Sequence, residues 1–358
     1  MRKSQQCGEE IYRESAKLVA MTAVEYYRRY PEILQRYGPE GRRRTEEDIQ
    51  YHYQTLAEAV ITKEENLFLR YIGWVKSVLV NRNVRADYLV DCLLIMQEVV
   101  TEALTEAVAA KATSYIRLAL DTFDSFAERP PSCIDSASSL SNLANAYLEA
   151  LLSSDREQAR EVIRSATRNG LSFREICDYV LQPVQHEVGR LWQVNQITVA
   201  QEHYCTSTTE RLMGEFGHPS PHVSEGPRFF VGACVAGEQH SIGIRMVSEN
   251  LEATGWRVYF TGANTPDASL TDLVRRSNVD VIGLSCATAL TLPALRRLIP
   301  QIRDCNKPTR IMVGGRIFCE FPSLWKKVGA DAFAEDVTSA MRIAEKLVGA
   351  RRPSEVKT

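Results

Sequence analysis

The feature that most constrains the fold is a change of hydrophobic period near residue 228. Short runs rich in Val, Ile and Phe follow it, with helix-length segments between them: RFFVGAC, RVYFTG, VDVIGLS, TRIMVGG and DAFAE. Because strands that alternate with helices pair in parallel, these five runs predict a doubly wound α/β domain over residues 227–350. Ligands of such sheets bind beyond the carboxyl ends of the strands. The loop after the first strand is therefore the first place to look for a site.

The first part of the chain has a helical pattern instead. Apolar residues recur at three- and four-residue spacing from about residue 8 to 127, with a break at YGPEGRRR near Gly38 and a stop at ERPPSC. Paired prolines end helices, so we expect an all-helical domain over residues 1–130.

Four shorter helical segments occupy residues 136–217. Ser172 and Thr198 each precede a Glu or Gln by three residues, which is the spacing of a capping box. Helices joined by short loops predict a four-helix bundle. A linker, GHPSPHVSEGP, follows over residues 217–227.

Composition limits the partners and the setting. The formal net charge is −2 and the dense basic run is GRRR at residues 41–44, so direct nucleic-acid binding is not expected. No run approaches the roughly 20 apolar residues of a membrane helix, so membrane association is not expected either. Nine cysteines without a CxxC pair indicate a reducing cytoplasm.

His240 is the candidate metal ligand of the α/β domain. It follows the first predicted strand, within EQHSIG. Such a histidine is by default a surface or cap residue. Here Glu238 lies two residues earlier, where its carboxylate can hold one ring nitrogen and leave the other for a metal. Gly243 permits the close approach of a large planar ligand.

The ends of two later strands carry small residues. Ser285 ends the third strand, and Gly314 and Gly315 end the fourth. EQHSIG is followed by 41 residues, SCA, 26 residues and GG. This order resembles the signature of the cobalamin-binding domain of corrinoid proteins: Asp-x-His-x-x-Gly, then Ser-x-Leu or Ser-x-Thr, then Gly-Gly.

The resemblance implies that His240 displaces the benzimidazole of cobalamin and binds cobalt from below. The displaced nucleotide tail would lie near Ser285 and the two glycines. Glu238 stands where the family has aspartate, and Ala287 replaces a larger residue of the serine motif. A phosphorylation receiver domain shares the expected flavodoxin-like fold, but its chemistry needs an aspartate where this chain has Ser285.

The expected bundle carries a second pattern. Trp192 ends its third helix, and Val199, Glu202 and His203 share one face of the fourth. Alone, these are an ordinary core tryptophan and solvated polar residues. Beside a cobalamin domain, Trp-x9-Glu-His resembles the bundle of the CarH family of light-sensing regulators.

In that family the bundle lies over the upper face of adenosylcobalamin. The resemblance implies that Trp192 packs on the deoxyadenosyl group, with Val199, Glu202 and His203 around it, and that light breaks the cobalt–carbon bond. A histidine that can bind cobalt after illumination directly follows the family's tryptophan. Gln193 stands there in this chain, which leaves His203, water or no new ligand as alternatives.

An apolar and aromatic stripe runs through YHYQTLAEAVITKEENLFLRYIGWVKSVLVNRNV in the N-terminal domain. Such a stripe is by default core packing. A helical domain without basic excess before a CarH-like module resembles the photocobilins, which pair cobalamin with a bilin in a globin-like domain. The resemblance implies noncovalent biliverdin, with His52, Tyr71, Trp74 and Arg82 as candidate contacts and Cys92 as a structural residue. Haem on a histidine is the alternative.

Together these patterns favour a light sensor over an enzyme. Its chromophores would be adenosylcobalamin and biliverdin, and its output a light-dependent change of homo-oligomeric assembly, read by an unidentified partner. The segment ARRPSEVKT after residue 349 is too short and polar for an output domain. The alternatives are a methyl-carrying corrinoid protein of a methyltransferase system and a haem-type redox or gas sensor.

Overall fold

The computed structural model describes residues 2–217 and 228–349, so most of the expected linker lies outside the described residues. The chain forms two compact units. The first comprises the residues up to Pro130 together with Gln193–Asn195, and the second comprises the rest. Within the described ranges, no helix is both long and apolar enough to cross a membrane.

The N-terminal unit is helical, as predicted. Between residues 2 and 121 its helices are α1 (Arg2–Arg29), α2 (Pro31–Thr62), α3 (Glu65–Asn81), α4 (Asp87–Ala103) and α5 (Glu106–Asp121). The expected break is a kink inside α2 at Gly38, whose φ is +65°. Leu56, Phe68 and Ile72 are fully buried, so these residues of the apolar stripe belong to the core of this unit.

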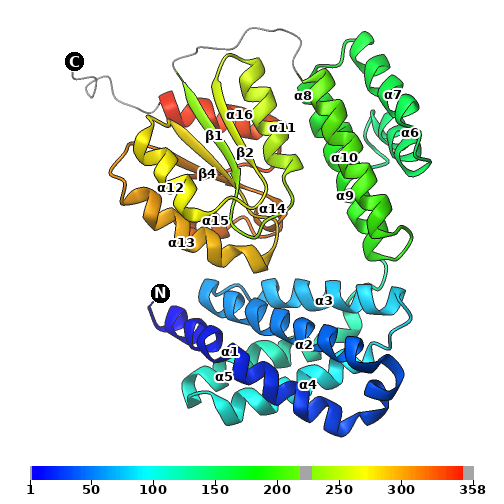
Figure 1. The fold of residues 1–358 in the computed structure, drawn as a ribbon, viewed down its shortest axis with the longest axis vertical. Helices are drawn as coiled ribbons and strands as arrows, with labels where there is room; N and C mark the ends of the chain where they lie inside the picture. The colour runs from blue at the N-terminus through cyan, green and yellow to red at the C-terminus, as the bar shows by residue number, and fades with distance from the viewer. Residues whose placement is uncertain (1, 218–227, 350–358) are drawn as a thin grey trace. The chain divides into compact units, whose positions relative to one another are not determined.

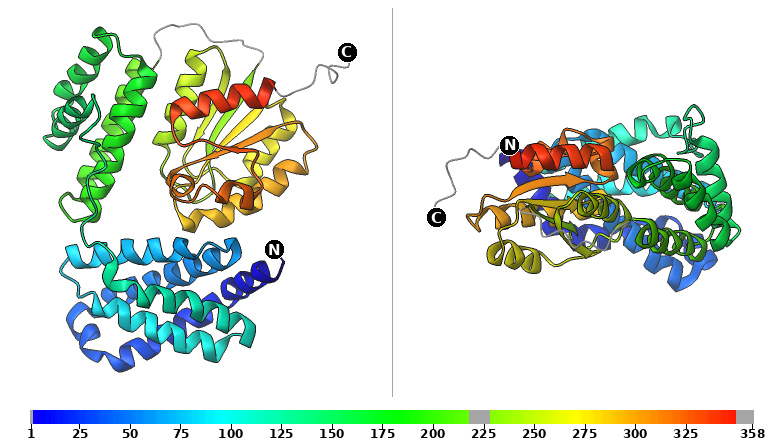
Figure 2. Two further views of the ribbon diagram at one scale, coloured as in Figure 1. Left: turned by 180° about the vertical axis from the view of Figure 1, so that it is seen from behind. Right: turned by 90° about the horizontal axis from the view of Figure 1, so that it is seen from above.

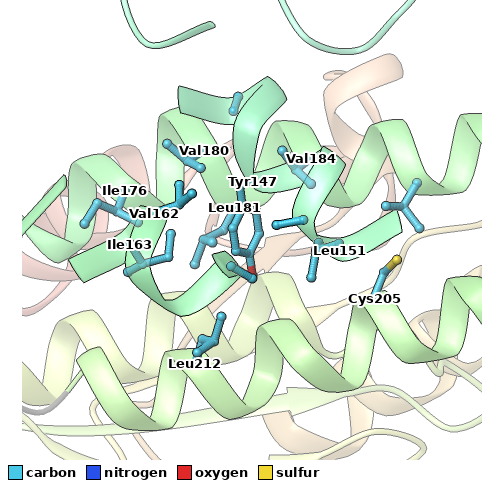
Figure 3. Packing of buried hydrophobic residues seen from close by; sticks show 14 of the residues in the cluster. Tyr147, Leu151, Val162, Ile163, Ile176, Val180, Leu181, Val184, Cys205 and Leu212 are labelled. Carbon is cyan, nitrogen blue, oxygen red and sulfur yellow. The ribbon is translucent and has the colours of Figure 1, made fainter. Parts of the chain in front are cut away.

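The second unit begins with a group of helices. These are α6 (Ser141–Leu152), α7 (Arg156–Arg168), α8 (Phe173–Ile176), α9 (Gln182–Gln193) and α10 (Val199–Phe216). A π-turn at Cys177–Leu181 joins α8 to α9. The predicted capping boxes at Ser172 and Thr198 are both present. Figure 3 shows the core of this bundle, in which Tyr147, Leu181 and Leu212 pack together.

A five-stranded sheet completes the second unit, with all neighbouring strands parallel and the order β2-β1-β3-β4-β5. The strands are β1 (Phe229–Cys234), β2 (Arg257–Gly262), β3 (Val281–Ser285), β4 (Arg310–Gly314) and β5 (Ala332–Phe333). The strands follow the five predicted runs, and the doubly wound parallel sheet is confirmed. Strand order reverses at β1, because β2 lies on one side of it and β3 on the other.

Helices cover both faces of the sheet (Figure 1). They are α11 (Ile242–Ala253), α12 (Asp267–Arg276), α13 (Leu292–Arg303), α14 (Arg316–Glu320), α15 (Leu324–Val328) and α16 (Val337–Gly349). Seen from behind, α16 lies across the sheet (Figure 2). Strands β1 and β3 are buried along their whole length, as expected of central parallel strands.

Candidate functional site

A cavity of about 570 Å³ lies in the second unit, beyond the carboxyl ends of β3 and β4. Helices α9 and α10 line one wall, and the β1–α11 loop, the strand ends and the start of α16 line the other. The lining includes nine residues expected from the sequence: Trp192, Val199, Glu202, His203, His240, Gly243, Ser285, Gly314 and Gly315. The structure therefore brings together residues that lie more than 120 positions apart in the chain.

His240 is fixed on this wall by Glu238. The His240 Nδ1 lies 2.5 Å from Glu238 Oε1, and the His240 backbone N–H donates to the same oxygen at 2.9 Å. The His240 side chain is 70% exposed, whereas that of Glu238 is 1% exposed. A buried carboxylate thus orients the ring through Nδ1 and leaves Nε2 for a ligand.

Both oxygens of Glu238 are occupied. Its Oε2 accepts hydrogen bonds from the Ala287 backbone N–H at 2.6 Å and from Thr291 Oγ1 at 3.0 Å. Burial alone would raise the pKa of this carboxyl group, but its hydrogen bonds and the charge of His240 lower it. The hydrogen bond to Glu238 in turn raises the pKa of His240 against the effect of burial. Sequence analysis missed Thr291, because its contact depends on how the segment after β3 folds back.

Gly314 and Gly315 lie at the carboxyl end of β4, and the close packing there leaves no room for a side chain at Gly315. Ser285 pairs with Gly314 across β3 and β4. Gly315 has φ +109°, and a Cβ built there would lie 2.3 Å from the backbone oxygen of Cys286. Any side chain at Gly315 would therefore push the β4–α14 turn away from the end of β3. At Gly243, by contrast, an added Cβ would meet no atom within 4 Å other than its chain neighbours and the backbone of its own helix.

The bundle wall carries a second histidine with a carboxylate partner. The His203 Nδ1 lies 2.7 Å from Glu202 Oε2, and Thr206 Oγ1 donates to Glu202 Oε1 at 2.9 Å. Val199 lies beside them and is 50% exposed. This wall offers an apolar surface next to fixed polar atoms.

His186 also lines the cavity, and sequence analysis missed it. It lies on the face of α9 that carries Gln182, Gln185, Gly189 and Trp192. Burial lowers its pKa to about 4, and the charge of Arg316 acts in the same direction. Counting back from Trp192 at helical spacing could have found this residue.

Asp178 anchors the bundle to the sheet domain. From the π-turn, its carboxylate accepts hydrogen bonds from the backbone N–H groups of Val337 and Thr338, at 2.9 and 3.2 Å, and from Thr338 Oγ1 at 2.5 Å. These groups form the first turn of α16, so a residue of the bundle caps a helix of the sheet domain. Gln182 Nε2 adds a contact to Glu335 O at 3.4 Å.

Three of the four candidate bilin contacts lie together in the N-terminal unit. The His52 Nδ1 lies 2.8 Å from Tyr71 Oη, and the Tyr71 ring stacks on Trp74 at a centroid distance of 6.3 Å. His52 is buried, and burial lowers its pKa to about 4. Trp74 is 41% exposed, so it departs from the core packing expected of the stripe. Burial raises the pKa of Cys92 to about 12, as for an inert core thiol.

Arg82 lies at the carboxyl end of α3, beyond that group. Its Nη1 donates to the backbone oxygens of Val78 at 3.2 Å and Gln193 at 3.0 Å. Both of these partners are carbonyl groups of the protein.

The metal-binding side chains of the cavity suit a metal ion that is already held in a macrocycle. Among residues 2–217 and 228–349, no group of three or more His, Cys, Asp or Glu side chains could hold a bare metal ion. One oriented imidazole fits a metal in a macrocycle, which needs only an axial ligand from the protein.

Comparison with known proteins indicates the same kind of ligand, a metal held in a macrocycle. Two family models, each described as a B12 binding domain, match residues 143–215 and 229–344. Dimethylamine corrinoid protein 1 of Methanosarcina acetivorans is 29% identical over 133 residues, which are 36% of this chain and 61% of that protein. The match thus spans less than two thirds of that relative.

Two further proteins are similar to this chain. The HTH-type transcriptional repressor CarA of Myxococcus xanthus is 30% identical over 140 residues, 39% of this chain and 46% of the repressor. The structure of the Methanosarcina barkeri monomethylamine corrinoid protein matches with a TM-score of 0.50 and 16% identity, over 58% of this chain and 100% of that one. The family matches cover both walls of the cavity, and the chain therefore contains a cobalamin-binding module.

Proposed function

We propose that the protein is a light sensor that holds adenosylcobalamin between His240 and the bundle. The observation that carries this proposal is a single cavity with an oriented imidazole on one wall and Trp192, Val199 and Glu202 on the other. When bound, adenosylcobalamin supplies a cobalt–carbon bond that visible light breaks. The wall with His240 would serve the lower face of the corrin ring, and the bundle wall the upper group.

His240 would bind cobalt through Nε2, since Nδ1 is held by Glu238. The Glu238 carboxylate fixes the orientation of the ring and increases its basicity. Because Glu238 is buried and also bonded to Ala287 and Thr291, it cannot turn away from His240 without losing four hydrogen bonds. This rigid support favours the protein histidine over the cofactor's own base.

The bundle wall would hold the adenosyl group. Trp192 and Val199 offer apolar surface to the adenine ring, and the Glu202 carboxylate can accept a hydrogen bond from a ribose hydroxyl. Loss of this group would leave the half-exposed Val199 uncovered. We therefore expect the bundle to shift on illumination and to change the assembly of the protein, with no catalysis required. His203, whose Nδ1 is also held by a carboxylate, is the candidate to approach the cobalt from this wall.

The N-terminal unit would add biliverdin as a second chromophore. His52, Tyr71 and the exposed ring of Trp74 form an aromatic group that suits a flat conjugated ligand. Haem bound to His52 is the alternative. Biliverdin gives a red absorption band, whereas haem gives a Soret band, so the spectrum of the loaded protein distinguishes them.

A methyl-carrying corrinoid protein is the second candidate, because a dimethylamine corrinoid protein is among the relatives. Such a carrier must expose its cobalt to the active site of a partner enzyme. It would bind methylcobalamin at least as well as adenosylcobalamin, and light would leave its assembly unchanged.

Size-exclusion chromatography with full-spectrum detection tests the sensor proposal. The protein is loaded with adenosylcobalamin and biliverdin and run in darkness and after green light. The sensor predicts that cobalamin co-elutes and that light changes the elution volume. Trp192→Ala should abolish the change, whereas Trp325→Ala, which alters a tryptophan away from the cavity lining, should keep it. Tight binding of cobalamin with no light-dependent change in wild type would contradict the sensor and favour the carrier.

A further inference from the structure

The carboxyl end of α3 holds two segments of chain that are far apart in sequence. Ser77 Oγ and Asn81 Nδ2 each donate to the backbone oxygen of Glu128 at 2.8 Å. Asn81 Oδ1 also accepts from Arg129 Nε at 3.1 Å. One residue further on, Arg82 Nη1 donates to the backbone oxygen of Gln193 at 3.0 Å. We call these four residues of the N-terminal unit and their contacts the α3 clamp: Ser77, Asn81, Arg82 and Arg129.

Gln193 lies next to the cavity in the chain. It directly follows Trp192, which lines the cavity, and consecutive Cα atoms are only about 3.8 Å apart. Although Gln193–Asn195 lie within the sequence of the bundle, they belong to the N-terminal unit. The turn is tight, because Gln196 N–H donates to Leu191 O at 2.8 Å and Asn195 has φ +57°. A displacement of Gln193 therefore has only one peptide link to cross before it reaches Trp192.

The same helix is firmly held in place and carries Tyr71 and Trp74, two of the three residues of the aromatic group. Ser77 and Lys76 are 1% and 6% exposed, and Lys76 Nζ donates to the backbone oxygens of Phe123 and Phe126. Tyr71 and Trp74 lie one to two turns before this anchored section of α3. A rigid helix thus links the His52–Tyr71–Trp74 group to the clamp.

We infer that Arg82 is a positioning residue that couples the N-terminal unit to the cavity through Gln193 and Trp192. Whatever binds beside Tyr71 and Trp74 changes the seating of Trp192, and a ligand in the cavity stabilises the N-terminal unit in return, because such coupling is reciprocal. The inference rests on the proposed function only for the identity of the cavity ligand.

Hydrogen exchange of the ligand-free full chain tests the clamp directly. A hydrogen bond to a charged donor is lost in Arg82→Ala, so the amides of residues 193–197 should exchange roughly tenfold faster than in wild type. Arg85→Ala is the matched control, since the Arg85 guanidinium donates to the neighbouring Asp87 carboxylate and both side chains are about two-thirds exposed. It should leave the exchange of this turn unchanged. Arg82→Lys, which keeps one charged donor, should fall between.

A second measurement adds hydroxocobalamin as the probe. In wild type its binding should slow amide exchange in α3, and in Arg82→Ala this protection should be lost. Equal exchange of residues 193–197 in wild type and Arg82→Ala would overturn the clamp, as would protection of α3 that persists in Arg82→Ala. If wild type binds no cobalamin, the proposed function fails, and the ligand-free comparison still decides the clamp.

Discussion

Replacement of Gly243 should change stability and ligand binding in opposite directions. Gly243 lies in the first turn of α11 and lines the cavity, and an added Cβ would meet no atom within 4 Å beyond its chain neighbours and its own helix backbone. A methyl group there meets nothing in the ligand-free protein, while alanine restricts the unfolded chain more than glycine does. Gly243→Ala should therefore raise the free energy of unfolding by up to about 1 kcal/mol.

The same methyl group occupies space that a bound corrin ring would need. Crowding by one methyl group in a close contact costs about 1–3 kcal/mol, so cobalamin should bind about 5- to 150-fold more weakly. Gly243→Leu should bind more weakly still. Thermal unfolding without ligand and spectrophotometric titration with hydroxocobalamin measure the two effects separately.

Gly189 provides a matched comparison on the opposite wall. It also lines the cavity, and an added Cβ there would meet no atom within 4 Å beyond its chain neighbours and its own helix backbone. Gly189→Ala should weaken adenosylcobalamin more than hydroxocobalamin, because only the former has a large upper group. Wild-type affinity of Gly243→Leu for hydroxocobalamin would refute the reasoning, since no ligand could then lie against the start of α11.

Three further predictions concern the anchor, the acid response and the strand ends. Asp178→Ala removes three hydrogen bonds between bundle and sheet domain, and should speed cobalamin release as measured by stopped-flow absorbance. Asp155→Ala is the control, because it removes the cap of α7 inside the bundle and should lower stability by about 1 kcal/mol without changing cobalamin release. Equal effects of the two variants on cobalamin release would contradict the role of Asp178 as an anchor. Burial lowers the pKa of His52 from 6.5 to about 4, so on acidification the unfolded protein protonates this histidine before the folded protein does. The free energy of unfolding should therefore fall by up to about 3 kcal/mol as the pH falls from 6.5 to 4. Urea unfolding at both pH values measures this loss, and an equal loss in His52→Gln would exclude His52 as its source. Gly315→Ala should lower the free energy of unfolding by about 1–3 kcal/mol even without ligand, because alanine rarely adopts the positive φ of this residue. Thermal unfolding measures the loss, and a melting temperature equal to that of wild type would contradict it.

The sequence predicted the sheet and the cavity residues because their signals are local. Five apolar runs mark the strands, and parallel strands place their carboxyl ends at one edge, so His240, Ser285 and Gly314 had to meet there. Pairs close in sequence, such as Glu238 with His240, could also be predicted, since two residues cannot lie far apart.

Contacts that depend on tertiary packing gave no such signal. Asp178 caps a helix that begins 159 residues later in the chain, and nothing in its neighbourhood marks it as a cap. Arg82 was a candidate bilin contact, yet its guanidinium donates to the backbone oxygens of Val78 and Gln193. A charged side chain in the sequence indicates that some polar group will bind it, but the tertiary structure determines which group that is.

The most direct test of the central claim uses adenosylcobinamide, a corrinoid that lacks the benzimidazole base. Without that base, only the protein can supply a nitrogen ligand to the lower face of cobalt. Wild type should convert the bound spectrum to that of a nitrogen-ligated corrinoid, and His203→Ala should do the same. His240→Ala should leave the spectrum that of a corrinoid without a nitrogen ligand. The same nitrogen-ligated spectrum in His240→Ala, or its absence in wild type, would contradict the assignment of His240 as the lower ligand.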